Sequence, residues 1–135
     1  MKKKKLRIFV SVSDRKGVVK FLNNLGKIFS LEIIATHGTG KYLKEKGIII
    51  TLVEKITGFP VLFSGRIKSI HLPIFAGVLA NKKNSEHLSQ LRKYKIKPFD
   101  MVVINFYPFQ MMVKEKKDLA EIIENIDIGG PALIR

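Results

Sequence analysis

Short apolar runs rich in β-branched residues alternate along this chain with segments in which apolar residues recur every three or four positions. The first pattern is typical of strands, and the second is typical of helices that cover them. We predict strands at residues 6–12, 31–36, 48–53 and 101–106, and the last two are apolar enough to be buried on both faces. Strands that alternate with helices predict a layered α/β domain with a mostly parallel sheet.

The segments between these strands carry helical spacing. Apolar residues three or four apart predict a helix over 18–29 and a shorter one over 41–46. Two further helices are expected over 86–94 and 117–126, and the second of these has one apolar face. Residues 57–69 contain Gly and Pro, which predicts mostly loop.

The length and the amino-acid content narrow the class of protein. A chain of 135 residues is long enough for one domain with a core of its own. The absence of Cys excludes a disulfide scaffold, a Cys-based zinc site and a thiol nucleophile. No apolar run approaches the ~18 residues of a membrane span, and the basic start lacks the hydrophobic region of a signal peptide. We therefore expect a cytoplasmic protein with no membrane partner.

The formal charge of +14 suggests a polyanion as partner. However, 20 of the 25 basic residues are Lys, and the densest run, at 2–5, contains no aromatic residue. Surfaces that read or stack on bases favour Arg and interleaved aromatic side chains. We therefore do not expect a nucleic-acid partner, and we attribute most of the charge to a lysine-rich surface.

Two turns between a predicted strand and a predicted helix are rich in hydroxyl residues and glycine. They span residues 11–17 and 36–41. Turns of this kind present backbone N–H groups to a phosphate at a helix N-terminus. Neither has the spacing of a P-loop, and ordinary helix capping by Ser13 and Thr39 is an equally good interpretation.

Further polar residues stand at the ends of other predicted elements. Arg66 and Lys68 lie in a loop, where surface exposure is the simpler interpretation. Asn105 and Tyr107 follow a predicted strand and could bind a ligand, or could be a capping Asn and a core Tyr. Asp127 precedes a glycine pair, so it could cap a helix or contact a ligand. The three His residues have no metal-like spacing, and we predict no metal site.

Six segments that are weak signals alone fall in one order along the chain. They are Ser11–Asp14, Ala35–Thr39, Thr57–Pro60, Gly65–Lys68, Asn105–Phe109 and Ile126–Gly130. Together they closely resemble the inosine monophosphate cyclohydrolase domain of the bifunctional purine biosynthesis protein. The resemblance extends from about Arg7 to Arg135.

This resemblance implies a three-layer, methylglyoxal-synthase-like α/β fold. It also implies closure of the purine ring, in which formylated aminoimidazole carboxamide ribotide loses water and becomes inosine monophosphate (IMP). No metal or organic cofactor is implied. The implied partner is the purine nucleotide substrate or product, and the family's tendency to dimerise makes a homodimer an expectation.

The resemblance also assigns site residues by position. The residues implied to bind the substrate are Ser11, Ser13, Asp14, Arg15, Thr36, Gly38, Thr39, Arg66, Ser69, Ile128 and Gly129. Among these, Thr36, Gly38 and Thr39 are implied to hold the 5′-phosphate. The residues implied to surround the reacting carboxamide and formyl groups are Lys68, Asn105, Tyr107 and Asp127.

The implied chemistry fits these residue types. A carboxamide nitrogen is a poor nucleophile, so the site must hold it close to the formyl carbon, stabilise an oxyanion and move protons as water leaves. We hypothesise that Lys68 stabilises the developing charge, while Tyr107 and Asp127 orient the amide and relay protons.

The sequence departs from the family pattern at several positions. Arg15 stands in place of a usual Lys, His37 in place of a Gly, and Leu72-Pro73 in place of a single Pro. The family continues past the position of Arg135 with another catalytic lysine and a formyltransferase domain. We therefore expect residues 1–135 to form a single, incomplete cyclohydrolase-like domain whose activity the missing lysine impairs.

Two other classes of function stay open. One is a non-catalytic nucleotide- or phosphate-binding module of the same fold, because the 35–39 segment also resembles allosteric domains of carbamoyl-phosphate synthetase. The other is a basic polyanion-binding protein, whose binding to random oligonucleotides would depend on salt.

Overall fold

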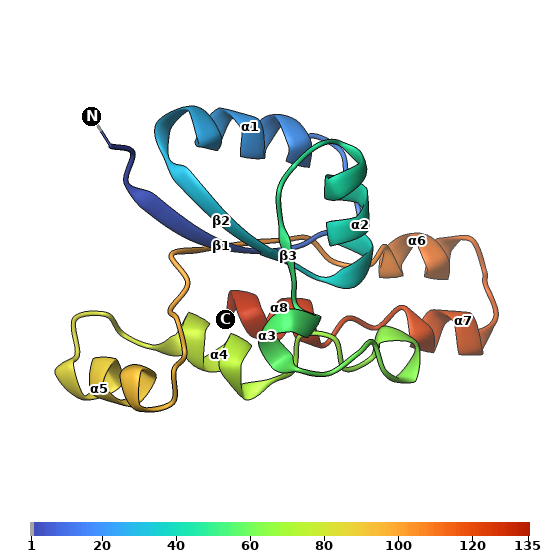
Figure 1. Cartoon of the computed structure of the whole chain (residues 1–135). Coiled ribbons are helices and arrows are strands. Elements are labelled where there is room, and N and C mark those ends of the chain that lie inside the picture. Colours follow the sequence, from blue (N-terminus) through green and yellow to red (C-terminus); the bar gives the residue numbers. More distant parts are fainter. Residues whose placement is uncertain (1) are drawn as a thin grey trace.

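A four-stranded parallel sheet forms the centre of the molecule in the computed structural model, which describes residues 2–135 (Figure 1). The strands lie in the order β3-β2-β1-β4. Their bounds are β1 (Lys5–Ser11), β2 (Ser30–Ala35), β3 (Thr51–Leu52) and β4 (Met101–Ile104). Because every pairing is parallel, all four strands end at the same edge of the sheet.

Helices α1 (Val18–Ile28) and α2 (His37–Glu45) cover one face of the sheet. The side chains of Ile8 and Val10 point from β1 into this layer and pack among buried residues of both helices. The spacing of Val18 and Leu22 on α1 places both in this core.

The opposite face is covered by α3 (Glu54–Thr57), α4 (Leu72–Leu79) and α8 (Gly129–Ile134). Phe9, which lies between Ile8 and Val10, points to this side because successive side chains of a strand alternate. It packs in a second core with Ile74 and Leu133. The predicted three-layer α/β fold with a parallel sheet is therefore confirmed.

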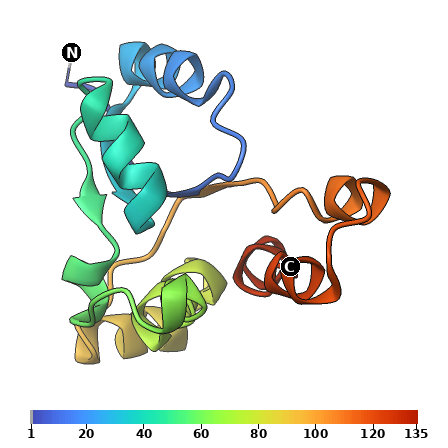
Figure 2. The ribbon, with the colours of Figure 1, turned by 90° about the vertical axis from the view of Figure 1, so that its right-hand side faces the viewer.

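The remaining helices lie at the margins of these layers. They are α5 (Ser85–Lys93), α6 (Phe109–Lys114) and α7 (Leu119–Glu124). Figure 2 shows α6 and α7 beside one another, to one side of the sheet. A short 3₁₀ turn, η1 (Phe63–Gly65), lies in the segment predicted as loop.

The predicted strand at 48–53 is wrong in length and in burial. Gly47 adopts a positive φ of 76° and Ile48 donates its N–H to the Leu43 carbonyl, so the chain is still turning away from α2 at this point. The side chain of Ile49 is 92% exposed, and only Thr51–Leu52 pairs with β2. The apolar run reflects a helix exit and a short edge strand.

Other predicted boundaries also need correction. The helix predicted over 41–46 begins at His37, so the glycines of the 36–41 segment are helical. The predicted helix over 117–126 shortens to α7, whose apolar face is largely exposed. The strand at 101–106 ends at Ile104 and is only half-buried. Helices α4 and α6 were not predicted.

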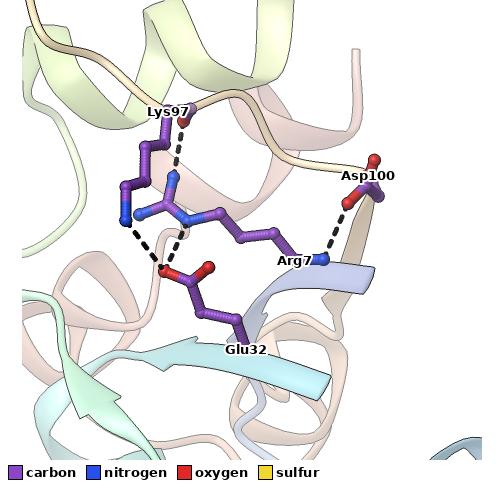
Figure 3. A network of polar contacts seen from close by, with 4 residues as sticks. All are labelled: Arg7, Glu32, Lys97 and Asp100. Carbon is purple, nitrogen blue, oxygen red and sulfur yellow. Dashed lines mark hydrogen bonds and ion pairs between the residues drawn. The ribbon is translucent and has the colours of Figure 1, made fainter. Parts of the chain in front are cut away.

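The amino-terminal edge of the sheet is held by a polar network (Figure 3). The Arg7 side chain, which is buried, contacts Glu32 of β2 and the Lys97 carbonyl, and its backbone N–H donates to the Asp100 carboxylate at 2.7 Å. These contacts join β1, β2 and the segment that leads into β4. Among residues 2–135, no helix is long and apolar enough to cross a membrane.

Candidate functional site

A cleft of about 650 Å³ lies at the carboxyl-terminal edge of the sheet. The loops after β1, β2 and β4 line it, together with the 64–70 segment and the residues around the start of α8. This is the usual position of a ligand site in a parallel α/β sheet. Of the site residues predicted from the sequence, all but Asp14 line this cleft.

Asn105 fixes the loop after β1. Its Oδ1 accepts hydrogen bonds from the backbone N–H groups of Ser13 at 2.6 Å and Asp14 at 3.1 Å, and its Nδ2 donates to the Asp14 carbonyl at 2.7 Å. The Asp14 carboxylate turns instead to the N–H of Lys16 at 2.9 Å. Asp14 is therefore held outside the cleft, where it shapes the loop.

The α2 start (residues 36–39) is locked to the same loop by hydroxyl groups. Thr39 Oγ1 accepts from the Val12 N–H at 3.0 Å and donates to the Val12 carbonyl at 3.2 Å. Thr36 Oγ1 lies 3.2 Å from the Ser11 hydroxyl. Both threonines are buried, which fits a role in fixing the position of the helix.

The interpretation of Ser13 and Thr39 as helix-capping residues is wrong. The N-cap of α1 is Gly17 and that of α2 is Thr36, and neither cap makes a side-chain hydrogen bond. The first N–H groups of a helix have no partner within the helix. Since Thr36, Gly38 and Thr39 line the cleft, α2 directs the partial positive charge of its N-terminus there.

Arg15 adds a full positive charge beside the α2 start. Its guanidinium lies over the Tyr42 ring, with Cζ 5.0 Å from the ring centroid, and Nη2 donates to the Gly38 carbonyl at 3.4 Å. The guanidinium therefore supplies both a positive charge and a stacking contact at this position.

Lys68 and Tyr107 form a pair on another wall of the cleft. Lys68 Nζ donates a hydrogen bond to the Tyr107 hydroxyl and lies 4.8 Å from the centroid of its ring. Both side chains are half-buried. Because the ammonium group occupies a lone pair of the hydroxyl oxygen, the phenolic proton remains available to another acceptor.

Asp127 holds the start of α8. Its Oδ1 accepts from the Gly130 N–H at 2.8 Å, which is the capping alternative left open by the sequence. Gly129 allows this helix to approach the buried Ser69, since a Cβ at position 129 would lie 2.8 Å from Ser69 Oγ. Asp127 lines the cleft as well, so capping does not remove it from the site.

Helix α7 contributes Glu124 to the cleft, and this residue was not among those predicted from the sequence. Arg66 forms a two-point ion pair with Glu124, in which Nε lies 3.2 Å from Oε1. The hydrogen bond from Arg66 lowers the pKa of Glu124 below its ordinary value, and the same contact raises the pKa of Arg66. The two residues lie 58 positions apart in the sequence and no spacing pattern relates them, so the pair could not be predicted from the sequence.

The charges of the cleft are mixed. Arg15, Arg66 and Lys68 line it together with Glu124 and Asp127. Within residues 2–135, no three His, Asp or Glu side chains gather as a metal site would require. The cleft thus offers N–H groups and cations that can bind an anion, together with a hydrogen-bonded lysine–tyrosine pair.

The three-layer fold and the cleft at the carboxyl edge of its parallel sheet place the chain among α/β proteins that bind anionic ligands at this edge. Comparison with known proteins identifies the family. Residues 17–132 match the family model of the MGS-like domain, and the chain belongs to this family. Its curated relatives include the bifunctional purine biosynthesis protein PurH of Persephonella marina, which is 49% identical over 129 residues. PurH of Caldicellulosiruptor bescii is 48% identical, and that of Bacillus subtilis is 42% identical.

These alignments cover 96% of this chain but only 25% of each relative. The chain thus spans about a quarter of the length of the curated relatives that it matches. Among solved structures, the crystal structure of ForH superimposes with a TM-score of 0.73 at 27% identity. That match covers 96% of this chain and 66% of the ForH chain.

Proposed function

We propose that this cleft binds a purine ribonucleotide and closes its ring as an IMP cyclohydrolase. The observation that carries the proposal is the hydrogen-bonded Lys68–Tyr107 pair, which lines the same cleft as the uncapped α2 start. A phosphate end and a reacting end in one cleft suit a nucleotide whose base undergoes the reaction. The similarity to relatives named PurH supports the same proposal.

The α2 start is the proposed position of the 5′-phosphate. The threonine hydroxyls there are engaged with the loop after β1, so the backbone N–H groups of Gly38 and Thr39 are the proposed donors. Arg15 supplies a full charge next to them. In this proposal Asn105 is a positioning residue, because both its carbonyl oxygen and its amide nitrogen hold the 13–14 backbone.

The reaction forms one C–N bond and releases one water. The carboxamide nitrogen attacks the formyl carbon, the electron pair of the carbonyl bond moves to the formyl oxygen, and the nitrogen loses a proton. Lys68 stabilises the oxygen that becomes negative, and the Tyr107 hydroxyl donates a hydrogen bond or a proton to it. Asp127 orients the attacking amide. The oxygen takes up the proton that the carboxamide nitrogen loses and becomes a hydroxyl group. Water leaves when the C–O bond breaks and this hydroxyl gains a second proton, balanced by the proton that the formylamino nitrogen releases as it forms the C=N bond of the aromatic ring.

The direct test is a cyclisation assay on the purified chain, followed by absorbance, beside a titration with IMP. The proposal expects saturable binding of IMP and turnover of the formylated ribotide. A chain that neither binds IMP nor cyclises the substrate would overturn the proposal.

A non-catalytic nucleotide-binding module is the second candidate. The observation that favours it is that Thr36 and Thr39 join the α2 start to residues 11–12, and Asn105 holds the loop after β1, without any contribution from Lys68. The binding end is thus built independently of the reacting end. Binding of IMP without any turnover would decide for this candidate.

A further inference from the structure

The first residue of α2 is joined to the first residue of α3. His37 Nδ1 lies 2.8 Å from Glu54 Oε1, and the His37 side chain is largely exposed whereas that of Glu54 is only 20% exposed. The other carboxylate oxygen, Glu54 Oε2, is buried and has no hydrogen-bond partner among residues 2–135. Among residues 2–135, the His37 imidazole therefore supplies the hydrogen bond that this carboxylate makes, and it does so at Oε1 alone.

The pair extends the contact between β2 and β3 beyond the ends of both strands. The Val53 N–H donates to the Ala35 carbonyl at 2.9 Å, and the next residue on the β3 side is Glu54. His37 follows Ala35 by two positions, so the two side chains meet where the backbones separate. On the opposite flank, Thr39 joins α2 to Val12. The α2 start is thus tied to both neighbouring segments.

We propose that His37 is a positioning residue for the phosphate end of the cleft, acting by holding and satisfying the Glu54 carboxylate. This inference rests on the proposed function, because it assigns the phosphate to the α2 start. Neither side chain lines the cleft, so the effect passes through the backbone of residues 36–39 and through charge.

The physical reason lies in the cost of an unsatisfied carboxylate. One oxygen of the Glu54 carboxylate is already buried without a partner, so loss of the hydrogen bond at Oε1 would drive the carboxylate toward solvent or toward another donor. The carboxylate lies beside the α2 start, because its partner His37 is the first residue of that helix, and no side chain caps the N–H groups there. Glu54 would then compete with a phosphate for the same helix N-terminus. His37 prevents this competition.

The experiment uses the full chain and compares IMP with inosine, which lacks the phosphate, in titrations followed by NMR. His37→Ala is expected to weaken IMP binding about fivefold, as coupled neighbours commonly do, and to leave inosine binding unchanged. The double variant His37→Ala/Glu54→Gln is expected to return within about twofold of the unmodified chain, because the competing charge is gone.

Two further variants separate positioning from general stability. His37→Gln retains an N–H donor for Glu54 and is expected to bind IMP as the unmodified chain does. Lys82→Ala removes an ion pair with Asp100 elsewhere in the fold and serves as the matched control. Equal weakening of IMP and inosine by His37→Ala, or a double variant no better than the single one, would overturn the inference. An unmodified chain that fails to bind IMP would instead overturn the proposed function, and the inference with it.

Discussion

Arg7 and Glu32 occupy paired positions of the parallel strands β1 and β2, and Arg7 Nε lies 3.2 Å from Glu32 Oε1 (Figure 3). The same guanidinium donates to the Lys97 carbonyl and lies over the Phe99 ring, with Cζ 4.5 Å from its centroid. A planar group with several donors can make these contacts together, whereas an ammonium group cannot. One side chain therefore joins three segments.

Arg7→Ala should lower the free energy of unfolding by about 2 kcal/mol, because a buried side chain and its contacts to β2 and to the 97–99 segment are lost. Arg7→Lys should recover part of this loss. Urea unfolding of the two variants measures the difference. Arg92→Ala, an exposed change on α5, is the control and should stay within about 0.5 kcal/mol. Equal stability of Arg7→Ala and Arg92→Ala would contradict the role of Arg7.

Asp100 should make stability sensitive to acid. Partial burial raises the pKa of its carboxyl, but hydrogen bonds from the Arg7 N–H and from Lys82 outweigh burial and hold the pKa below its ordinary value. A lowered folded-state pKa stabilises the fold above the ordinary carboxyl pKa of about 4, and this stabilisation disappears as the pH falls through the folded-state value.

Asp100→Asn is therefore expected to cost stability at pH 7 and progressively less as the pH falls below about 4. Thermal unfolding of both chains between pH 7 and pH 2.5 measures the gap in Tm. A gap that stays constant over this range would show that the charge of Asp100 contributes nothing.

Gly77 and Gly26 should respond in opposite directions to the same change. A Cβ at position 77 would lie 2.9 Å from the Lys97 carbonyl oxygen and 3.0 Å from the Phe99 ring. Gly77→Ala must therefore displace backbone, and we expect it to destabilise the chain by about 1–3 kcal/mol. A Cβ at position 26 meets Leu31 at an ordinary 3.8 Å. Gly26→Ala, within α1, should stabilise by about 0.5 kcal/mol. Urea unfolding checks both signs.

Lys68→Ala should reduce cyclisation by about a hundredfold or more while IMP affinity changes only a few-fold, since an oxyanion donor acts mainly in the transition state. Tyr107→Phe, which removes the hydroxyl that Lys68 contacts, should reduce turnover by about a hundredfold. Lys20→Ala, an exposed change on α1, controls for loss of charge. Undiminished turnover in Lys68→Ala would remove this residue from the mechanism.

Asn105→Ala should weaken IMP binding by about tenfold, because the loop at 13–14 loses three hydrogen bonds and with them its fixed position. Hydrogen exchange of the Ser13 and Asp14 amides should increase in the same variant. Asn24→Ala, on the exposed side of α1, should change neither. Protection at Ser13 that survives Asn105→Ala would contradict the positioning role.

The sequence predicted the layers and the edge at which polar residues meet, because period and β-branching report burial directly. The strand predicted at 48–53 was wrong because the end of α2 is determined by the positive φ of Gly47 and by the hydrogen bond from Ile48 to the Leu43 carbonyl. The hydrophobicity of the run does not report either feature. Helix α4 was missed because its residues are apolar all round, so no apolar stripe with helical spacing stands out from a polar face.

The sequence predicted most of the residues that line the cleft, because they belong to recognisable motifs. It did not predict the contacts between residues of different segments. Pairing of Arg66 with Glu124, or of His37 with Glu54, depends on which loops the fold brings together. Asp14 and Asn105 were both singled out, but only the geometry shows that one holds the backbone of the other.

The Arg7 network lies at the edge where β1 and β4 begin, and the cleft lies at the edge where they end. Because the two sets of residues lie at opposite edges, we expect substitutions in the Arg7 network to change stability without changing the groups that line the cleft. Relatives with this fold can then differ in melting temperature while they recognise the same ligand. In protein engineering, the first edge is the place for stabilising substitutions, and the second edge is the place for substitutions that change ligand selectivity.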